Sequence, residues 1–257
     1  VCGYNVGPTC YLPRGNDIRP SKSGQWGLGT RYRVTSETEL GLYYLDYKDR
    51  SPSIVMSQLG GYNVKYFDGI KMLGTTVSTT FGMFSAFGEA SLRKGTPVLM
   101  GEMSTPVRGK VAQGNVGGIF NFGRNALSDE LTMAAEISGS RVLSVEEGSI
   151  DNLAFKTRNS LVAAATLTLG YPGIFEGWDL SIPISYQSQL RGRSLVGTFG
   201  GGQGDSRLSI GATFVRKSNL SVNVTYTNYM GSPSTDPLRN RMLADRDQLS
   251  MTMKYSF

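Results

Sequence analysis

Six charged side chains stand at the polar positions of stretches in which apolar and polar residues alternate. They are Arg31, Arg33, Glu89, Glu136, Asp179 and Lys254. Charges of both signs inside a β-barrel can pair across the wall or set the ion preference of a pore. We therefore predict that these residues face an aqueous lumen, where they pair, tune a pore, or hold a plug or a network of internal water.

The remaining reactive residue types argue against enzyme chemistry. The 257-residue chain contains no histidine, whereas hydrolases built on membrane barrels generally use a histidine base. We predict no enzymatic activity and no cofactor. The two cysteines, Cys2 and Cys10, are too few to hold a metal. They lie in a Gly/Pro-rich stretch, and in an exported protein such a pair predicts one small disulfide.

Period-two alternation dominates the sequence and predicts the elements that carry these residues. In the stretch Leu220–Tyr226 the apolar residues occupy every second position, with Ser, Asn and Thr between them. This pattern indicates a strand with one apolar and one polar face. We expect roughly eleven such strands, each close to the ~10 residues that a tilted strand needs to cross a bilayer. The expected strands cover about 25–36, 37–48, 69–81, 83–94, 112–122, 131–138, 161–169, 178–186, 208–214, 220–226 and 249–257.

The expected connections alternate between short turns and long polar loops. The long set covers about 49–68, 95–111, 145–157, 190–205 and 231–246. Outer-membrane barrels have short periplasmic turns and long outer loops. The fold we predict is therefore all-β, an antiparallel transmembrane β-barrel whose apolar faces contact lipid. No stretch approaches the ~18 apolar residues of a spanning helix.

Aromatic residues near the expected strand ends fit an interfacial girdle. They are Trp178, Tyr186, Tyr226, Tyr255 and Phe257. The alternative is that they fill the core of a soluble sandwich, which has less need for regularly alternating long and short connections. A strand that ends in an aromatic residue is typical of the C-terminal assembly signal of outer-membrane barrels. Placing Phe257 at the periplasmic side puts the start of the strand 25–36 outside the cell. Since bacterial barrels normally have an even strand number, we expect this chain to be the C-terminal part of a larger barrel.

The domain organisation follows from that orientation. We interpret residues 1–24 as an extracellular loop or lumen-associated segment, and residues 25–257 as the barrel strands. The net charge of +6 is spread over loops and alternate strand positions, without a basic helix. We therefore expect no nucleic-acid partner. Outer-membrane lipid and lipopolysaccharide are the expected partners, and the bacterial outer membrane is the expected location.

Several segments resemble a known family. The stretch Glu39–Tyr47, continuing into Arg50 and Pro52, is similar to a strand-and-loop motif of domain of unknown function 1302, found in Gram-negative bacteria. Further similar segments are Ser23–Gly27, Leu131–Glu136, Asp245–Leu249 and Lys254–Phe257. The resemblance implies a longer outer-membrane protein that acts beside an inner-membrane efflux-type lipid transporter and a periplasmic lipoprotein-like partner. It implies no site residues.

Three functions remain open on this basis. The first is passage or docking of hydrophobic molecules or lipids across the envelope, which would explain apolar residues at the inward positions Phe87, Ile119 and Val162. The second is a general diffusion porin with a charged constriction. The third is a soluble β-rich structural or binding protein. The transported molecule, the strand total and the oligomeric state do not follow from the sequence.

Overall fold

The computed structural model describes residues 13–57, 60–196, 201–217 and 219–256. Cys2, Cys10 and Phe257 lie outside these residues, so the disulfide and the role of the last aromatic stay predictions. No helix within the described ranges has the length and apolar character needed to cross a membrane.

Within these residues, eleven strands form one antiparallel sheet, and two further strands form a separate hairpin. The strands of the sheet are β1 (Trp26–Arg33), β2 (Thr38–Tyr47), β5 (Ile70–Phe81), β6 (Phe84–Met100), β7 (Thr105–Gly123), β8 (Glu130–Val145), β9 (Asn159–Phe175), β10 (Trp178–Gly192), β11 (Ser206–Arg216), β12 (Leu220–Met230) and β13 (Gln248–Tyr255). The hairpin consists of β3 (Ser53–Met56) and β4 (Tyr62–Lys65). The prediction of an all-β antiparallel fold with about eleven strands is confirmed.

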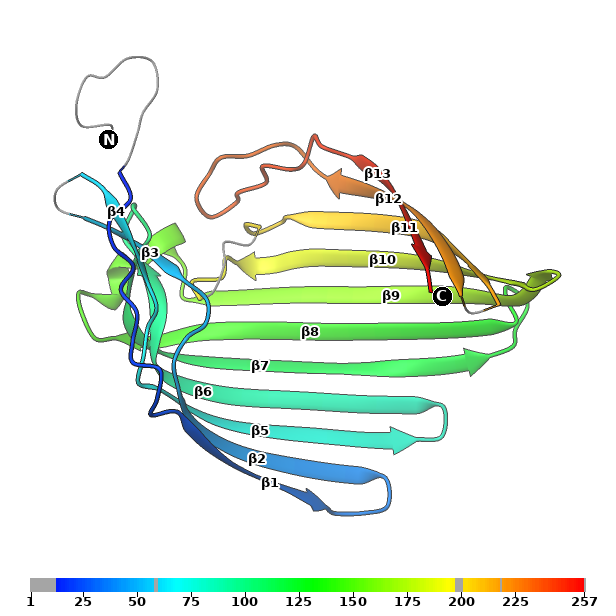
Figure 1. The fold of residues 1–257 in the computed structure, drawn as a ribbon, viewed down its shortest axis with the longest axis horizontal. Helices are drawn as coiled ribbons and strands as arrows, with labels where there is room; N and C mark the ends of the chain where they lie inside the picture. Colours follow the sequence, from blue (N-terminus) through cyan, green and yellow to red (C-terminus); the bar gives the residue numbers. More distant parts are fainter. Residues whose placement is uncertain (1–12, 58–59, 197–200, 218, 257) are drawn as a thin grey trace.

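The strands of the sheet follow one another in sequence order, with the β3–β4 hairpin inserted between β2 and β5. Figure 1 shows β5 to β9 nearly parallel across the view, while β12 and β13 run steeply across it, so the sheet twists strongly. Among the described residues, β1 and β13 each pair on one side only and form the two edges.

The two ends of the sheet differ in their connections, as Figure 1 shows. At the end we call the turn end, the connections are 34–37, 82–83, 124–129, 176–177 and 217–219. At the opposite end, the loop end, the connections 48–69, 146–158, 193–205 and 231–247 are long. The segment 13–20 also lies at the loop end, where Arg14 and Ile18 form parallel bridges to Tyr62 and Lys65.

The prediction of a long loop over 95–111 is wrong. Strands β6 and β7 instead continue past the other strands as one hairpin, closed by the short connection 101–104. The alternation breaks there because a bulge at Gly95 shifts the register between Lys94 and Thr96. Gly95 has a φ of 81°, a left-handed conformation that favours glycine at such bulges.

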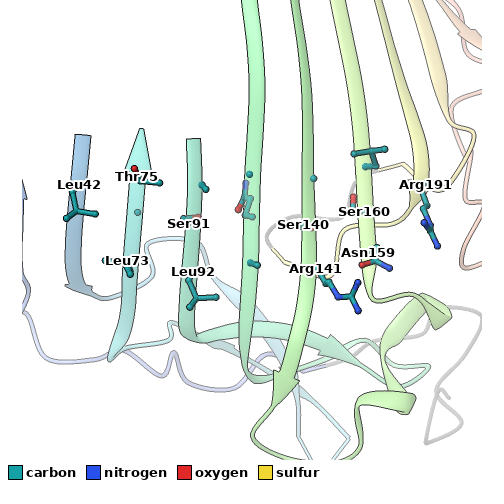
Figure 2. Close-up of a pocket in the computed structure, with 17 residues that line it drawn as sticks. Leu42, Leu73, Thr75, Ser91, Leu92, Ser140, Arg141, Asn159, Ser160 and Arg191 are labelled. Carbon is teal, nitrogen blue, oxygen red and sulfur yellow. The ribbon is translucent and has the colours of Figure 1, made fainter. Parts of the chain in front are cut away.

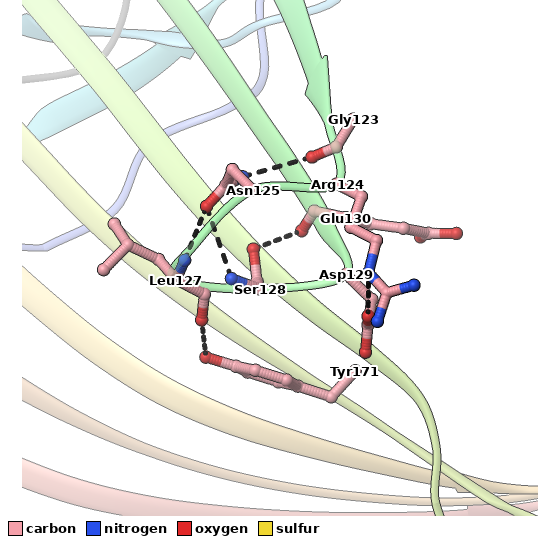
Figure 3. A network of polar contacts seen from close by, with 8 residues as sticks. All are labelled: Gly123, Arg124, Asn125, Leu127, Ser128, Asp129, Glu130 and Tyr171. Carbon is pink, nitrogen blue, oxygen red and sulfur yellow. Dashed lines mark hydrogen bonds and ion pairs between the residues drawn. The ribbon is translucent and has the colours of Figure 1, made fainter.

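The turn between β7 and β8 shows how the turn end fixes the strand register (Figure 3). The side-chain oxygen of Asn125 accepts hydrogen bonds from the backbone N–H groups of Leu127 at 2.8 Å and Ser128 at 3.3 Å. The hydroxyl of Tyr171, on β9, donates to the carbonyl of Leu127 at 2.8 Å. Asparagine is favoured in such turns because its side-chain oxygen can take the place of a backbone carbonyl as the hydrogen-bond acceptor. The turn is thereby tied to the next hairpin.

The register divides the sheet into two chemically different faces, since cross-strand partners share a face. One face, called the apolar face, carries rows such as Val116, Ile137 and Ala163. The polar face carries the residues between them, such as Asn115 and Ser138. The same division runs through the paired strands from β1 to β13, apart from register shifts near the ends of the β6–β7, β7–β8 and β9–β10 pairs.

A small hydrophobic core lies at the loop end. It is made of Val98, Met100, Val111, Val142, Leu153, Ala154 and Leu195, all of them buried. Leu153 and Ala154 belong to the segment that carries two short 3₁₀ helices, η1 (Ile150–Asn152) and η2 (Ala154–Lys156). This segment therefore packs against β6, β7 and β8. Outside this cluster Phe67 and Ile70 are also buried, whereas many large apolar side chains of the strands remain substantially exposed, including Leu28, Leu42 and Leu249.

Candidate functional site

A shallow groove with a volume of about 640 Å³ crosses the apolar face over β2 and β5 to β10. Its apolar sides are formed by the leucines Leu42, Leu73, Leu92 and Leu161. Figure 2 shows Leu73 and Leu92 side by side on β5 and β6, and Arg141 and Arg191 further along the sheet on β8 and β10. The groove thus combines an apolar surface with positive charge at one side.

The groove exists because the middle of one row of the apolar face, on β6 to β8, has almost no side chains. Ala90, Gly114 and Gly139 are direct cross-strand partners on β6, β7 and β8. The next row toward the turn end carries the larger Val116 and Ile137. A Cβ atom at Gly114 would have one neighbour within 4 Å, the carbonyl oxygen of Glu89 at 3.2 Å. At Gly139 it would lie 3.3 Å from both the Leu161 Cδ1 atom and the carbonyl oxygen of Ser160. The backbone is therefore close at the base of both positions, and the groove is the space above it that longer side chains would fill.

Basic residues lie along the loop-end side of the groove. Lys71, Lys94 and Lys110 are direct cross-strand partners on β5, β6 and β7. Arg141 lies one row closer to the turn end on β8, and Arg191 a further row on β10. Strands in barrels are tilted relative to the barrel axis, so a line at constant height along the axis crosses successive cross-strand rows in this way. The five cations therefore follow one border of the apolar surface.

A second, smaller pocket of about 240 Å³ lies on the polar face over β2 and β5 to β7. Tyr43, Glu89, Arg93 and Asn115 line it. The Nε atom of Arg93 and the Oδ1 atom of Asn115 are buried and have no hydrogen-bond partner within the described part of the chain. The pocket therefore offers one donor and one acceptor to a bound polar group or water.

The six charged residues predicted from sequence all lie on the polar face by the register of their strands. The Nε atom of Arg31 donates to the hydroxyl of Tyr43 at 2.9 Å and lies 3.9 Å from the carboxylate of Glu39. Arg33 is the cross-strand partner of Glu39. Whether this face borders a lumen stays a prediction.

The acidic members of the set differ in their surroundings. Asn115 is the cross-strand partner of Glu89, and its amide donates to Glu136 at 3.3 Å. Asp179 instead accepts a hydrogen bond from the backbone N–H of Gly173 at 2.8 Å, close to the turn end.

Lys254 lies on the edge strand β13, opposite Ser221. The structure thus places Glu89 and Glu136 beside the same residue, Asn115, and Asp179 and Lys254 on other strands.

Two loop residues, Asp247 and Arg193, form hydrogen bonds that hold the connections at the loop end in place. Asp247 accepts hydrogen bonds from the Tyr226 hydroxyl and the Asn228 amide, both at 2.6 Å. These bonds lower the pKa of the Asp247 carboxyl and tie the start of β13 to β12. The guanidinium of Arg193 lies 4.0 Å from the ring centre of Phe155 and donates to the carbonyl of Pro237 at 3.0 Å. Burial lowers the pKa of Arg193.

Comparison with known proteins identifies one family. The family described as "Protein of unknown function (DUF1302)" matches residues 4–257. The resemblance seen in the sequence motifs is therefore confirmed over nearly the whole chain. No curated protein matches the sequence.

Two solved structures illustrate the fold comparison. OmpT, an outer membrane protein of Vibrio cholerae, aligns with a TM-score of 0.39 and 11% identity over 91% of each chain. The Pseudomonas putida toluene transporter TodX aligns with a TM-score of 0.38 and 12% identity, over 90% of this chain and 73% of its own. Neither likeness carries an argument about function.

Proposed function

This chain belongs to the DUF1302 family of proteins of unknown function. From that premise we propose that it forms part of the wall of a β-barrel in a bacterial outer membrane. We propose further that it takes part in the passage or docking of hydrophobic molecules or lipids. The partners proposed with it are membrane lipid and lipopolysaccharide, a periplasmic lipoprotein and an inner-membrane efflux-type transporter. The proposal assigns no catalytic step to the chain.

The membrane part of the proposal is supported by the exposure of the apolar face. Leu42 is 54% exposed, Leu73 50% and Ile137 48%. A contiguous apolar surface with such exposed side chains is costly in water, and it marks a site of contact with a membrane or a partner. A wall strand in a bilayer presents this pattern, with apolar side chains toward lipid and polar side chains toward the interior.

The single observation that carries the function is the groove across the apolar face. Its row of Ala90, Gly114 and Gly139 leaves a channel of open space between leucine side chains. An extended hydrocarbon chain fits such a surface because its methylene groups gain contact on both sides. On the opposite, polar face, Phe87, Ile119 and Val162 are separate apolar contact points among polar neighbours.

Filling the groove should weaken the binding of hydrocarbon chains. Gly114→Leu and Gly139→Leu are suited to this test, because neither glycine has a left-handed φ. Displacing about two methylene groups of a bound chain costs about 1.6 kcal/mol, which weakens binding roughly tenfold. The measurement is native mass spectrometry of the full-length protein in detergent, titrated with diacylglycerol.

The matched control is Ala212→Leu, which adds the same side chain to the apolar face outside the groove and opposite Val224. We expect the control to bind diacylglycerol as the unsubstituted protein does. Equal binding by the groove variants and the control, at equal amounts of folded protein, would show that the groove holds no hydrocarbon chain.

A diffusion porin is the second candidate, and the charges of the polar face favour it. Arg31, Glu89, Glu136 and Lys254 place both signs on one face, as a charged constriction would require. Single-channel conductance in a planar bilayer separates the two functions. A large, steady ion current favours the porin, and a sealed or small conductance favours passage of hydrophobic molecules.

A further inference from the structure

Three lysines of the apolar face occupy one cross-strand row. Lys71 is the direct partner of Lys94, and Lys94 is the direct partner of Lys110. Like charges directly opposite each other on a sheet destabilise it. Asp46 continues the row on β2 as the partner of Lys71. The row therefore holds three positive charges against one negative charge.

Within the described residues, Asp46 is the one carboxylate of this row, and it leaves the row with a net positive charge. Among the described residues, none of Lys71, Lys94 and Lys110 takes part in a salt bridge. Arg141 and Arg191, which follow along the same border, also form none within that part of the chain. An arrangement of unpaired, mutually repelling cations is stabilised when an external anion binds between them.

The surface on either side of the row shows what kind of anion fits. Toward the turn end, the next row carries Leu73, Leu92 and Ala112, which belong to the apolar groove. Toward the loop end lies a polar hollow of about 620 Å³, lined by Lys71 and Lys94 and also by the carboxylate residues Asp46, Asp68 and Glu146. The cations thus stand between a surface for hydrocarbon and a space for a polar group.

Other cations of the polar hollow are already committed to the protein. The guanidinium of Arg108 binds the carboxylate of Asp68 at 2.6 Å. The ammonium group of Lys48 donates to the backbone carbonyls of Ser21 and Ser23. Lys71 and Lys94 are therefore the cations of this hollow that are left to meet a ligand.

We propose that the row Lys71, Lys94 and Lys110 binds the phosphate group of an anionic membrane lipid whose acyl chain lies in the adjoining groove. This inference rests on the proposed function and specifies its lipid class. The occupant is a lipid of the surrounding leaflet rather than a soluble anion, because the row adjoins apolar surface and basic residues at a membrane border attract anionic headgroups. Arg141 and Arg191 extend the same contact along the groove.

The test compares two lipids that differ only in the phosphate group. Phosphatidic acid and diacylglycerol with identical acyl chains are titrated into the full-length protein in detergent, and binding is followed by native mass spectrometry. We expect phosphatidic acid to bind roughly tenfold or more tightly than diacylglycerol. The triple variant Lys71→Gln, Lys94→Gln, Lys110→Gln should lose this preference and keep its binding of diacylglycerol.

The control variant Lys156→Gln, Lys217→Gln, Lys254→Gln removes the same charge from positions outside the row, and it should keep the preference. An unchanged preference in the row variant overturns the inference, as does equal binding of the two lipids by the unsubstituted protein. Competition by millimolar inorganic phosphate would overturn the lipid assignment in favour of a soluble anion. Failure of diacylglycerol itself to bind would instead contradict the groove and the function proposed for it.

Discussion

Ile137→Arg should destabilise the protein by about 2–4 kcal/mol when it is folded in a bilayer, because arginine at the middle of a lipid-facing strand loses its hydration. Ile137 lies on the apolar face between Val116 and Ala163, and it is 48% exposed. In a water-soluble protein, an arginine at such an exposed position would cost little. The measurement is equilibrium unfolding of the full-length protein from lipid vesicles with a chemical denaturant.

The matched control is the neighbouring substitution Ser138→Arg. Ser138 lies on the polar face opposite Asn115 and Val162, where an arginine side chain can reach water. We expect a much smaller loss of stability there. Similar losses at both positions, or a loss at Ser138 alone, would contradict the assignment of the apolar face to lipid.

Leu153→Ala should cost about 2–5 kcal/mol at the loop end, where a truncated leucine leaves a cavity. Leu153 is 5% exposed and packs with Val98, Val111 and Leu195, which come from different elements. The loss should appear as local opening, since this small core is separate from the exposed apolar face. Hydrogen exchange of the backbone amides in 146–158 measures it directly.

A leucine in a neighbouring loop provides the control. Leu243 is 47% exposed in the connection between β12 and β13, so Leu243→Ala should change stability by less than about 0.5 kcal/mol. Protection of 146–158 that is the same in both variants would show that the small core does not hold the 3₁₀ segment in place.

Sequence alone predicts the strands and their faces because alternation is a local property. The stretch Leu220–Tyr226 is contained within β12, and its apolar residues share a face with Met251 and Met253 of β13. Placing Arg31 and Glu136 on one face requires only that each strand keep its own period of two. The assignment of residues to faces therefore stays correct even where a predicted strand boundary is slightly wrong.

The groove and the lysine row could not be predicted in the same way, since they depend on which residues face each other across strands. The tight turn 82–83 fixes the pairing of Lys71 with Lys94, so this half of the row was accessible from the sequence. The pairing of Lys94 with Lys110 was not accessible from the sequence, because the bulge at Gly95 interrupts the alternation and the end of the β6–β7 hairpin was therefore predicted as a loop. The same error hid the row of Ala90, Gly114 and Gly139.

Contact between the apolar face and hydrocarbon is measured most directly by spin labels placed one at a time along β8, from Leu131 to Gly139. The protein carries serine in place of Cys2 and Cys10 and is reconstituted in lipid vesicles. Labels at Leu131, Met133, Ala135, Ile137 and Gly139 should collide with oxygen, which concentrates in lipid, and labels at the positions between them with a water-soluble nickel complex. Labels on the apolar face that are shielded from both reagents would place that face inside a protein core and contradict the membrane assignment.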